Sequence, residues 1–214
     1  MNKIKSLLII VITAGMLLGA HSALACVGRK LIIGYMPFTE QAILAQMLAI
    51  MVEERTGTKV SLKELEDSVE AHRALEANEI QLYIEYTGIG VSEVLGVKPD
   101  KNAKVLYRQA KKAYNKNFNI IWLKRFGYSS TYTEFADFIK QGIPLDPAPV
   151  VRKSTLKKFP ALSRLLNKLK GKISVKQINS MIVQVEREGK KPREVASRFL
   201  SNLGISFSFN PGRA

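Results

Sequence analysis

The sequence predicts an α/β fold organised around a β-sheet. In the first half of the chain, short apolar segments alternate with helix-like segments in the order strand, helix, strand, helix, strand. Hydrophobic residues make up 46% of the 214 residues, which is enough to bury a core. Together these observations exclude a disordered chain, a collagen-like chain and a protein with many membrane spans.

A change of pattern near Gly34 predicts the first strand and the first helix. Residues 31–34 form a short apolar run that ends in glycine. Thr39 is of a residue type that caps helices, and the residues after it predict a long, buried helix over residues 40–56, which Gly57 ends.

A second helix is predicted between two further strands. Residues 59–65 alternate between polar and apolar side chains as a strand does, and residues 81–85 form another apolar strand. Between them, Ser68 is placed to cap a helix that runs to Ala77, and Asn78 begins a turn.

The middle of the chain continues this pattern and is basic. We expect a short helix over residues 89–95, a longer helix over residues 102–115, and a strand over residues 120–123 that contains the only tryptophan. Residues 101–125 contain eight basic residues and no acidic one. A solvated helix face and a docking patch both fit this charge.

The last third of the chain is predicted to be helical. Residues 126–149 lack clear periodicity and contain several glycines and prolines, which predicts a crossover loop. Three helices are expected after it, over residues 160–170, 174–185 and 192–203. The second of these begins with the serine and glutamine of a capping box.

The composition limits the chemistry. One cysteine and two histidines cannot form an intrachain disulfide or a Cys/His zinc site, and neither histidine has a nucleophile at motif-like spacing. We interpret the acidic residues between 64 and 70 as a solvated turn and helix start. The sequence therefore predicts a protein that is not an enzyme, with no metal and no cofactor.

The first 25 residues have the pattern of a secretory signal peptide. Lys3 and Lys5 precede an apolar run over residues 7–18, and Ala-Leu-Ala at residues 23–25 suits a signal peptidase. We expect export to the periplasm, with an N-terminal anchor helix as the alternative. Cys26 follows directly and could be lipidated, which would make the protein a membrane-anchored lipoprotein.

Two loops are candidates for a binding site because ligands in open α/β sheets lie beyond the carboxyl ends of strands. They are residues 35–39 and residues 86–88, and each contains a tyrosine. The first loop also begins the long helix, whose free amides favour an anion. An aromatic face beside an anion site would suit a zwitterion.

Four segments stand in an order typical of one protein family. They are GYMPFTEQ at residues 34–41, a stretch ending in IQLYIEYTG at residues 74–88, GYSSTY at residues 127–132 and PAPVVRK at residues 147–153. In these segments the chain resembles the substrate-binding proteins of osmoprotectant ABC importers, which capture glycine betaine, choline or carnitine.

The resemblance implies a periplasmic-binding-protein type II-like fold, in which two lobes close on the ligand. Here the insertion that would form the second lobe is largely absent. We therefore expect a signal peptide at residues 1–25, the N-terminal part of lobe 1 at 26–125, a remnant crossover at 126–148, a helical C-terminal part of lobe 1 at 149–205 and a tail at 206–214.

The resemblance also implies a set of ligand-binding residues. Tyr86 and Tyr132 match rings that surround the quaternary ammonium group in the family. Packing in the sheet is an alternative role for Tyr86 and is the role expected of Tyr83 on the same strand. The residues expected at the ligand are Tyr86, Tyr132, Thr39, Thr87 and Gly88.

Two positions depart from the family pattern. Met36 stands where a lysine is common, and Ile89 stands where a hydroxyl residue commonly follows Thr-Gly. Both changes weaken the expected capture of a carboxylate.

Three functions are compatible with the sequence. The first is a receptor that binds a quaternary-ammonium compound and delivers it to the membrane subunit of an ABC importer; a homodimer could replace the lost lobe. The second is a degenerate member that acts as an exported interaction or structural protein. The third is a protein that associates with an anionic membrane surface, because residues 150–214 carry 15 basic and three acidic residues. Export argues against nucleic acid as a partner.

Overall fold

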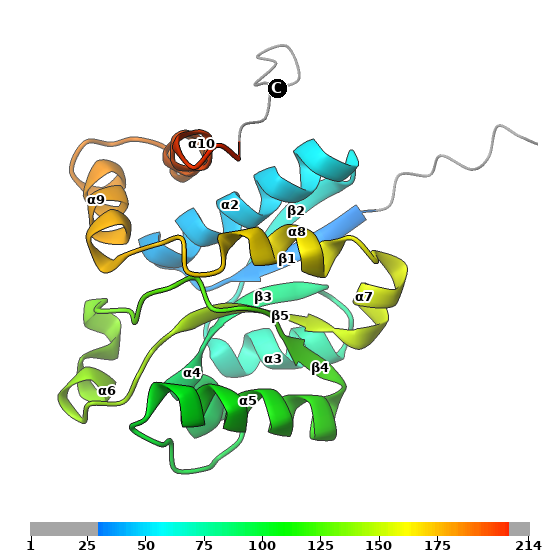
Figure 1. The fold of residues 1–214 in the computed structure, drawn as a ribbon, viewed down its shortest axis with the longest axis vertical. Helices are drawn as coiled ribbons and strands as arrows, with labels where there is room; N and C mark the ends of the chain where they lie inside the picture. Colours follow the sequence, from blue (N-terminus) through cyan, green and yellow to red (C-terminus); the bar gives the residue numbers. More distant parts are fainter. Residues whose placement is uncertain (1–29, 206–214) are drawn as a thin grey trace, which may run out of the picture.

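A five-stranded mixed sheet organises the part of the chain that the structure describes, residues 30–205 of the computed structural model (Figure 1). Its strands stand in the order β2-β1-β3-β5-β4. β1 pairs in parallel with β2 and β3, whereas β5 is antiparallel to both of its neighbours. The strands are β1 (Lys30–Tyr35), β2 (Lys59–Glu64), β3 (Leu82–Tyr86), β4 (Ile120–Trp122) and β5 (Pro147–Arg152).

The helices connect these strands and cover the sheet. Those between the strands are α2 (Thr39–Thr56), α3 (Ser68–Glu76), α4 (Thr87–Ile89) with the π-helical turn Gly90–Val94, α5 (Ala103–Phe118), the 3₁₀ turn Thr133–Phe135 and α6 (Ala136–Lys140). After β5 come α7 (Lys153–Lys158), α8 (Leu162–Leu166) with the 3₁₀ turn Asn167–Leu169, α9 (Val175–Glu186) and α10 (Pro192–Asn202). None of the helices within residues 30–205 has the length and apolar character of a membrane span.

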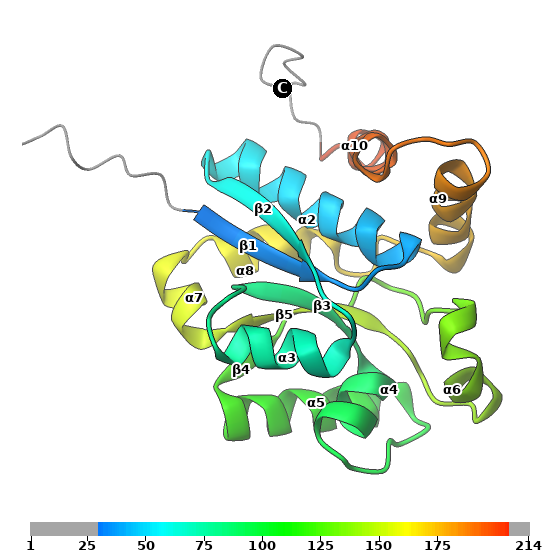
Figure 2. The same ribbon diagram turned by 180° about the vertical axis from the view of Figure 1, so that it is seen from behind.

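Two apolar clusters fill the two faces of the sheet. On one face α2 packs against α8, α9 and α10, and on the other α3 and α5 pack against the strands, as the two opposite views show (Figures 1 and 2). Trp122 and Tyr83 are buried in the second cluster, where the tyrosine is in the core rather than at a ligand. The sequence prediction of an α/β lobe is therefore confirmed.

The helix starts differ from the prediction in two places. Phe38, not Thr39, occupies the N-cap position of α2, and no side chain caps this helix. Asp67, not Ser68, caps α3 by accepting from the amide of Glu70. In each helix the N-cap position therefore lies one residue earlier than expected.

The C-terminal helices follow the sequence more closely. The capping box of Ser174 and Gln177 at α9 is present as predicted, and α10 begins at Pro192. The expected helix after Pro160 is present only as the short helix α8 and the 3₁₀ turn after it. The sequence reading missed α7.

The crossover region was expected to be a loop, yet its end is the strand β5, with Pro147 and Pro149 inside it. Pro149 lies opposite Leu123, one residue beyond the end of β4, and accepts from its amide at 2.8 Å. The carbonyl of Leu123, which an amide at position 149 would meet, accepts the Tyr107 hydroxyl at 2.6 Å instead. The missing amide of Pro149 therefore leaves no carbonyl without a donor at this position.

No second lobe lies between β4 and β5. Residues 123–146 connect them and form only the 3₁₀ turn Thr133–Phe135 and α6 as regular structure. This segment lies along the edge where β1 and β3 end (Figures 1 and 2). The shortened crossover predicted from the sequence is thus part of the wall of the same lobe.

Glu85 is a buried carboxyl group next to the last residue of β3. It accepts hydrogen bonds from the Ser68 hydroxyl, from the Tyr83 hydroxyl at 3.1 Å and from the Tyr86 amide at 2.7 Å. Burial raises the pKa of Glu85 to about 8, and these hydrogen bonds only partly oppose the effect. At neutral pH the folded chain therefore holds Glu85 mostly protonated.

A substitution in the middle of α2 tests the core. Leu48 is fully buried between the sheet and the C-terminal helices. We expect Leu48→Ala to lower the free energy of unfolding by about 2–5 kcal/mol, because it removes apolar contacts and leaves a cavity. Denaturant unfolding measures this loss, and the exposed control Glu54→Ala should change stability by less than about 0.5 kcal/mol.

Glu85 should make stability depend on pH. Its pKa is about 8 when folded against an ordinary 4.5, so between these values the folded chain holds a proton that the unfolded chain has released. His72, whose pKa burial lowers from 6.5 to about 4, has the opposite effect below pH 6.5. Between pH 6.5 and 8 we expect stability to fall as pH rises, by up to about 1.4 kcal/mol per unit.

Denaturant unfolding at several pH values in this window, with wild-type protein and Glu85→Gln, provides the measurement. The amide cannot ionise, so the variant should show a flatter pH dependence, while the exposed control Glu54→Gln keeps the wild-type slope. A variant that loses stability as steeply as the wild type would contradict the assignment of this dependence to Glu85.

Candidate functional site

The predicted ligand residues gather where β1 and β3 end. The loop after β1 leads into α2, β3 passes directly into α4, and residues 123–146 lie against both. Tyr86 is the last residue of β3, and Tyr132 comes from the crossover segment. The site is therefore built from three stretches of chain that are distant in sequence.

Four aromatic rings form a continuous group here, which we call the strand-end rings: Phe38, Tyr86, Tyr132 and Phe135. The Phe38 ring stacks on Tyr132 with centroids 4.9 Å apart and on Tyr86 at 6.3 Å. Phe135 meets the edge of Phe38 at 5.5 Å and lies 4.7 Å from Tyr86. The two predicted tyrosines are thus brought together through Phe38, which lies between them.

Tyr86 is fully buried, and its hydroxyl is occupied. It donates to Glu40 Oε1 at 2.8 Å, and Tyr128 donates to the same oxygen at 3.0 Å. The Ser130 hydroxyl donates to Glu40 Oε2 at 2.8 Å. Burial raises the pKa of Glu40, and the three hydroxyl hydrogen bonds oppose that rise. Glu40 therefore joins the start of α2 to the end of β3 and to the crossover segment.

Thr87 and Gly88 contact the chain itself. The Thr87 hydroxyl donates to the Pro144 carbonyl at 3.0 Å and accepts from the Asp146 amide at 3.1 Å. A Cβ on Gly88 would lie 2.9 Å from that same Pro144 carbonyl and 2.8 Å from the Ile143 side chain. The Thr-Gly pair thus holds the end of the crossover segment against β3.

Thr39 and Tyr132 lie together at the start of α2. The Tyr132 hydroxyl donates to Glu186 of α9 at 3.4 Å. Burial raises the pKa of Tyr132, the charge of Glu186 raises it further, and hydrogen bonds with Thr39 lower it. Both residues are partly exposed, so this end of the strand-end rings is open to solvent. The remaining candidate, Cys26, lies outside the described residues.

A cavity of about 360 Å³ opens beside the strand-end rings, and we call it the strand-end cavity. Phe38, Phe135 and Phe138 form its aromatic wall, with Met36 and Ile89 nearby. These last two are the positions that depart from the family pattern, so the cavity has apolar side chains where the family suggested a lysine and a hydroxyl. Tyr86 and Tyr132 do not line it.

The other wall of the strand-end cavity is acidic. Its charged residues are Glu66, Asp67, Glu93 and Glu134, with no basic residue among those that line it. Burial raises the pKa of Glu93, and the nearby charge of Asp67 raises it further. A space enclosed by aromatic rings and carboxylates favours a positively charged organic group.

Sequence reasoning missed most of the residues that line the strand-end cavity. Glu66 and Asp67 were interpreted as a solvated turn, and Asp67 does cap α3, but the turn also faces the cavity. Phe135 lies in the stretch without periodicity, where no pattern indicated a buried ring. Phe38 lies in the GYMPFTEQ segment, directly before Thr39. Its aromatic side chain in the loop after β1 was the one signal in the sequence that could have indicated the aromatic wall of the cavity.

Comparisons with known proteins show what this chain is similar to. Residues 29–136 and 140–202 match the model of the substrate binding domain of the ABC-type glycine betaine transport system. Over 106 residues the chain is 30% identical to an ergothioneine transport permease/ergothioneine binding protein of Helicobacter pylori, covering 49% of this chain and 19% of that protein. Over 102 residues it is 28% identical to a carnitine transport binding protein of Listeria monocytogenes, covering 47% of this chain and 33% of that protein.

Solved structures show the same fold. A glycine betaine/carnitine/choline ABC transporter structure aligns with a TM-score of 0.73 at 17% identity, over 83% of this chain and 98% of the other. The protein YehZ of Escherichia coli aligns with a TM-score of 0.71 at 17% identity, over 83% of this chain and 99% of the other.

The chain spans a third or less of the length of these two curated relatives. The family match nevertheless covers most of the residues that build the sheet, its helices and the strand-end rings. The protein therefore belongs to the family of substrate-binding domains of ABC-type glycine betaine transport systems.

Proposed function

We propose that this protein is the exported solute-binding component of an ABC importer and that it captures an organic cation of the quaternary-ammonium type. The observation that carries the proposal is the strand-end cavity, which combines aromatic rings with carboxylates at the edge where β1 and β3 end. Family membership supports a transport role, and open α/β sheets bind ligands at this edge.

The charge of the cavity favours a cation without a carboxylate. Quaternary ammonium groups bind to aromatic faces, and nearby carboxylates add electrostatic attraction. The same carboxylates repel the acid group of a zwitterion, and Met36 supplies no positive charge to hold it. We therefore expect choline to bind more tightly than glycine betaine or carnitine.

Each predicted residue has a role in this proposal. Phe38 and Phe135 contact the cation, and Tyr86 and Tyr132 belong to the site through their stacking on either side of Phe38. Thr39 positions the start of α2 beside Tyr132.

Thr87 and Gly88 act by holding the crossover segment in place. Their contacts with residues 143–146 fix the end of the segment that carries Phe135 and Phe138 to the cavity. In this arrangement one lobe supplies both walls of a site that the family builds between two lobes. Release of the ligand would occur at the importer's membrane subunit, with Cys26 as the candidate point of lipid attachment.

A thermal-shift titration tests the ligand. Ligand at 100 times its dissociation constant should stabilise the folded chain by about 2.7 kcal/mol, which raises the melting temperature by several degrees. We expect a saturable shift with choline and smaller shifts with glycine betaine and carnitine. The absence of a shift with all three compounds at millimolar concentration would overturn the proposal.

Two variants test the walls of the cavity. Phe38→Leu keeps apolar volume but removes the aromatic face, and should raise the choline dissociation constant by about 2- to 30-fold. Glu93→Gln with Glu134→Gln should raise it by about tenfold, because two attractive charges are lost.

The matched control is Glu54→Gln with Glu188→Gln, which removes the same charge from exposed residues outside the cavity. Calorimetric titration of choline into the wild type and the three variants gives the dissociation constants. Equal weakening by the cavity pair and the control pair would show that the charge of the whole protein, and not this site, attracts the ligand.

A further inference from the structure

A second cavity lies beyond the end of β4 and shares no lining residue with the strand-end cavity. Its volume is about 500 Å³, within the range of small-molecule sites. It lies where the chain leaves β4 for the crossover segment, so we call it the neck pocket. The side chains that matter are Tyr107, Lys124, Arg125, Ser129, Asp146 and Lys170.

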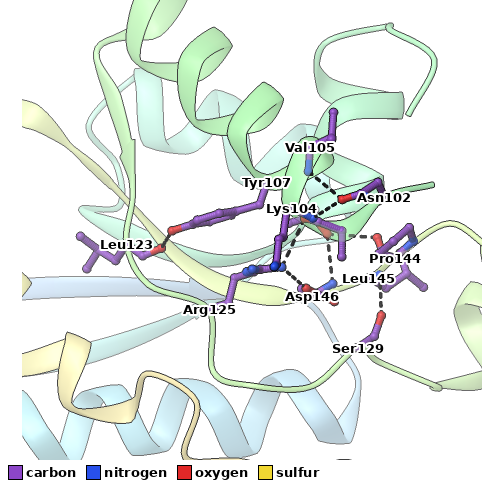
Figure 3. Close-up of polar contacts among 12 residues, drawn as sticks. Asn102, Lys104, Val105, Tyr107, Leu123, Arg125, Ser129, Pro144, Leu145 and Asp146 are labelled. Carbon is purple, nitrogen blue, oxygen red and sulfur yellow. Dashed lines mark hydrogen bonds and ion pairs between the residues drawn. The ribbon is translucent and has the colours of Figure 1, made fainter. Parts of the chain in front are cut away.

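The Arg125 side chain makes several contacts in this pocket, and Figure 3 shows the polar ones. Its Nη1 pairs with the Asp146 carboxylate and donates to the Ala103 carbonyl at 3.3 Å. The guanidinium carbon lies 4.6 Å from the centroid of the Tyr107 ring, and the hydroxyl of that tyrosine is fixed on Leu123. Both hydrogen bonds use Nη1, so the Nη2 and Nε donors have no acceptor among the described residues.

The pocket carries excess positive charge. Lys124 and Lys170 line it together with Arg125, and within residues 30–205 no carboxylate lies within ion-pair distance of either lysine. The one carboxylate of the lining, Asp146, is already paired with Arg125. A neutral ligand would leave these two lysines without a counter-charge, whereas an anion of charge near −2 would balance them.

Neutral donors of the pocket suit an anion that presents several oxygen atoms. The Ser129 hydroxyl accepts from the Leu145 amide at 2.7 Å, which leaves its own proton free to donate. The amides of Gly127 and Ser129 donate to no group in the described part of the chain. Gly127 has φ +126°, and a Cβ there would lie 2.6 Å from Gly171 Cα, so backbone alone forms this part of the wall.

We propose that the neck pocket binds a phosphate group, carried by a small phosphomonoester. A dianionic phosphate matches the two unpaired lysines, and its oxygens can accept from the free edge of Arg125 and from the Ser129 hydroxyl. The pocket is larger than a bare phosphate, which leaves room for an organic group beside the Tyr107 ring. This site does not depend on the proposed capture of a cation.

Calorimetric titration of the full chain with glycerol 3-phosphate, at low ionic strength, tests the proposal. We expect saturable binding that inorganic phosphate also produces and that acetate does not displace. Lys124→Gln with Lys170→Gln should weaken binding by about tenfold or more. The matched control, Lys112→Gln with Lys176→Gln, removes the same charge from exposed positions outside the pocket and should change the affinity less than about twofold.

A vesicle arm separates a soluble ester from a lipid headgroup, since both carry the same phosphate. If the headgroup enters the pocket, vesicles of phosphatidylcholine with phosphatidic acid should bind the control double variant. They should not bind the double variant that lacks both pocket lysines. If the two double variants lost binding equally, either to the soluble phosphates or to the vesicles, general charge attraction would explain the binding and the proposal would be overturned. The absence of binding to soluble phosphates and vesicles would also overturn the proposal, provided that circular dichroism shows all proteins to be folded.

Discussion

One carboxylate holds together the edge of the sheet on which the strand-end rings depend. Glu40, at the start of α2, accepts hydroxyl groups from the end of β3 and from two residues of the crossover segment. It is almost fully buried, and no basic side chain pairs with it among the described residues. A buried carboxyl group needs such donors, because an unsatisfied one would cost several kcal/mol. The positions of Tyr86, Tyr128 and Ser130 are therefore linked through a single acceptor.

The polar groups of the family motif all have partners within the chain. The Glu-Tyr-Thr-Gly stretch suggested a ligand site, yet its polar groups bind the chain's own segments: Tyr86 to Glu40, and Thr87 to residues 144 and 146. With residues 123–146 in the place of a second lobe, their side chains lie against the edge where β1 and β3 end. In this chain the motif therefore faces the chain's own crossover segment.

The sequence predicted the lobe better than the site. Strands such as residues 31–34 and helices such as residues 40–56 follow from local periodicity, which depends only on neighbouring residues. β5 was missed because Pro147 and Pro149 argue against a strand, and the donor that replaces the amide of Pro149 is the hydroxyl of Tyr107, a residue distant in sequence. The acidic wall was missed for a related reason: whether Glu66 faces solvent or a cavity is decided by contacts with a distant segment.

The position of β5 has a consequence for how the chain acquires its structure. β5 lies between β3 and β4 in the sheet, so β3 and β4 share no ladder hydrogen bonds. They are joined only through β5, which comes last of the five strands in the sequence. Before residue 152 is available, β3 and β4 each expose an unsatisfied edge, and such edges invite pairing with other chains. The sheet is thus a single cooperative unit with long-range closure, which favours slow folding.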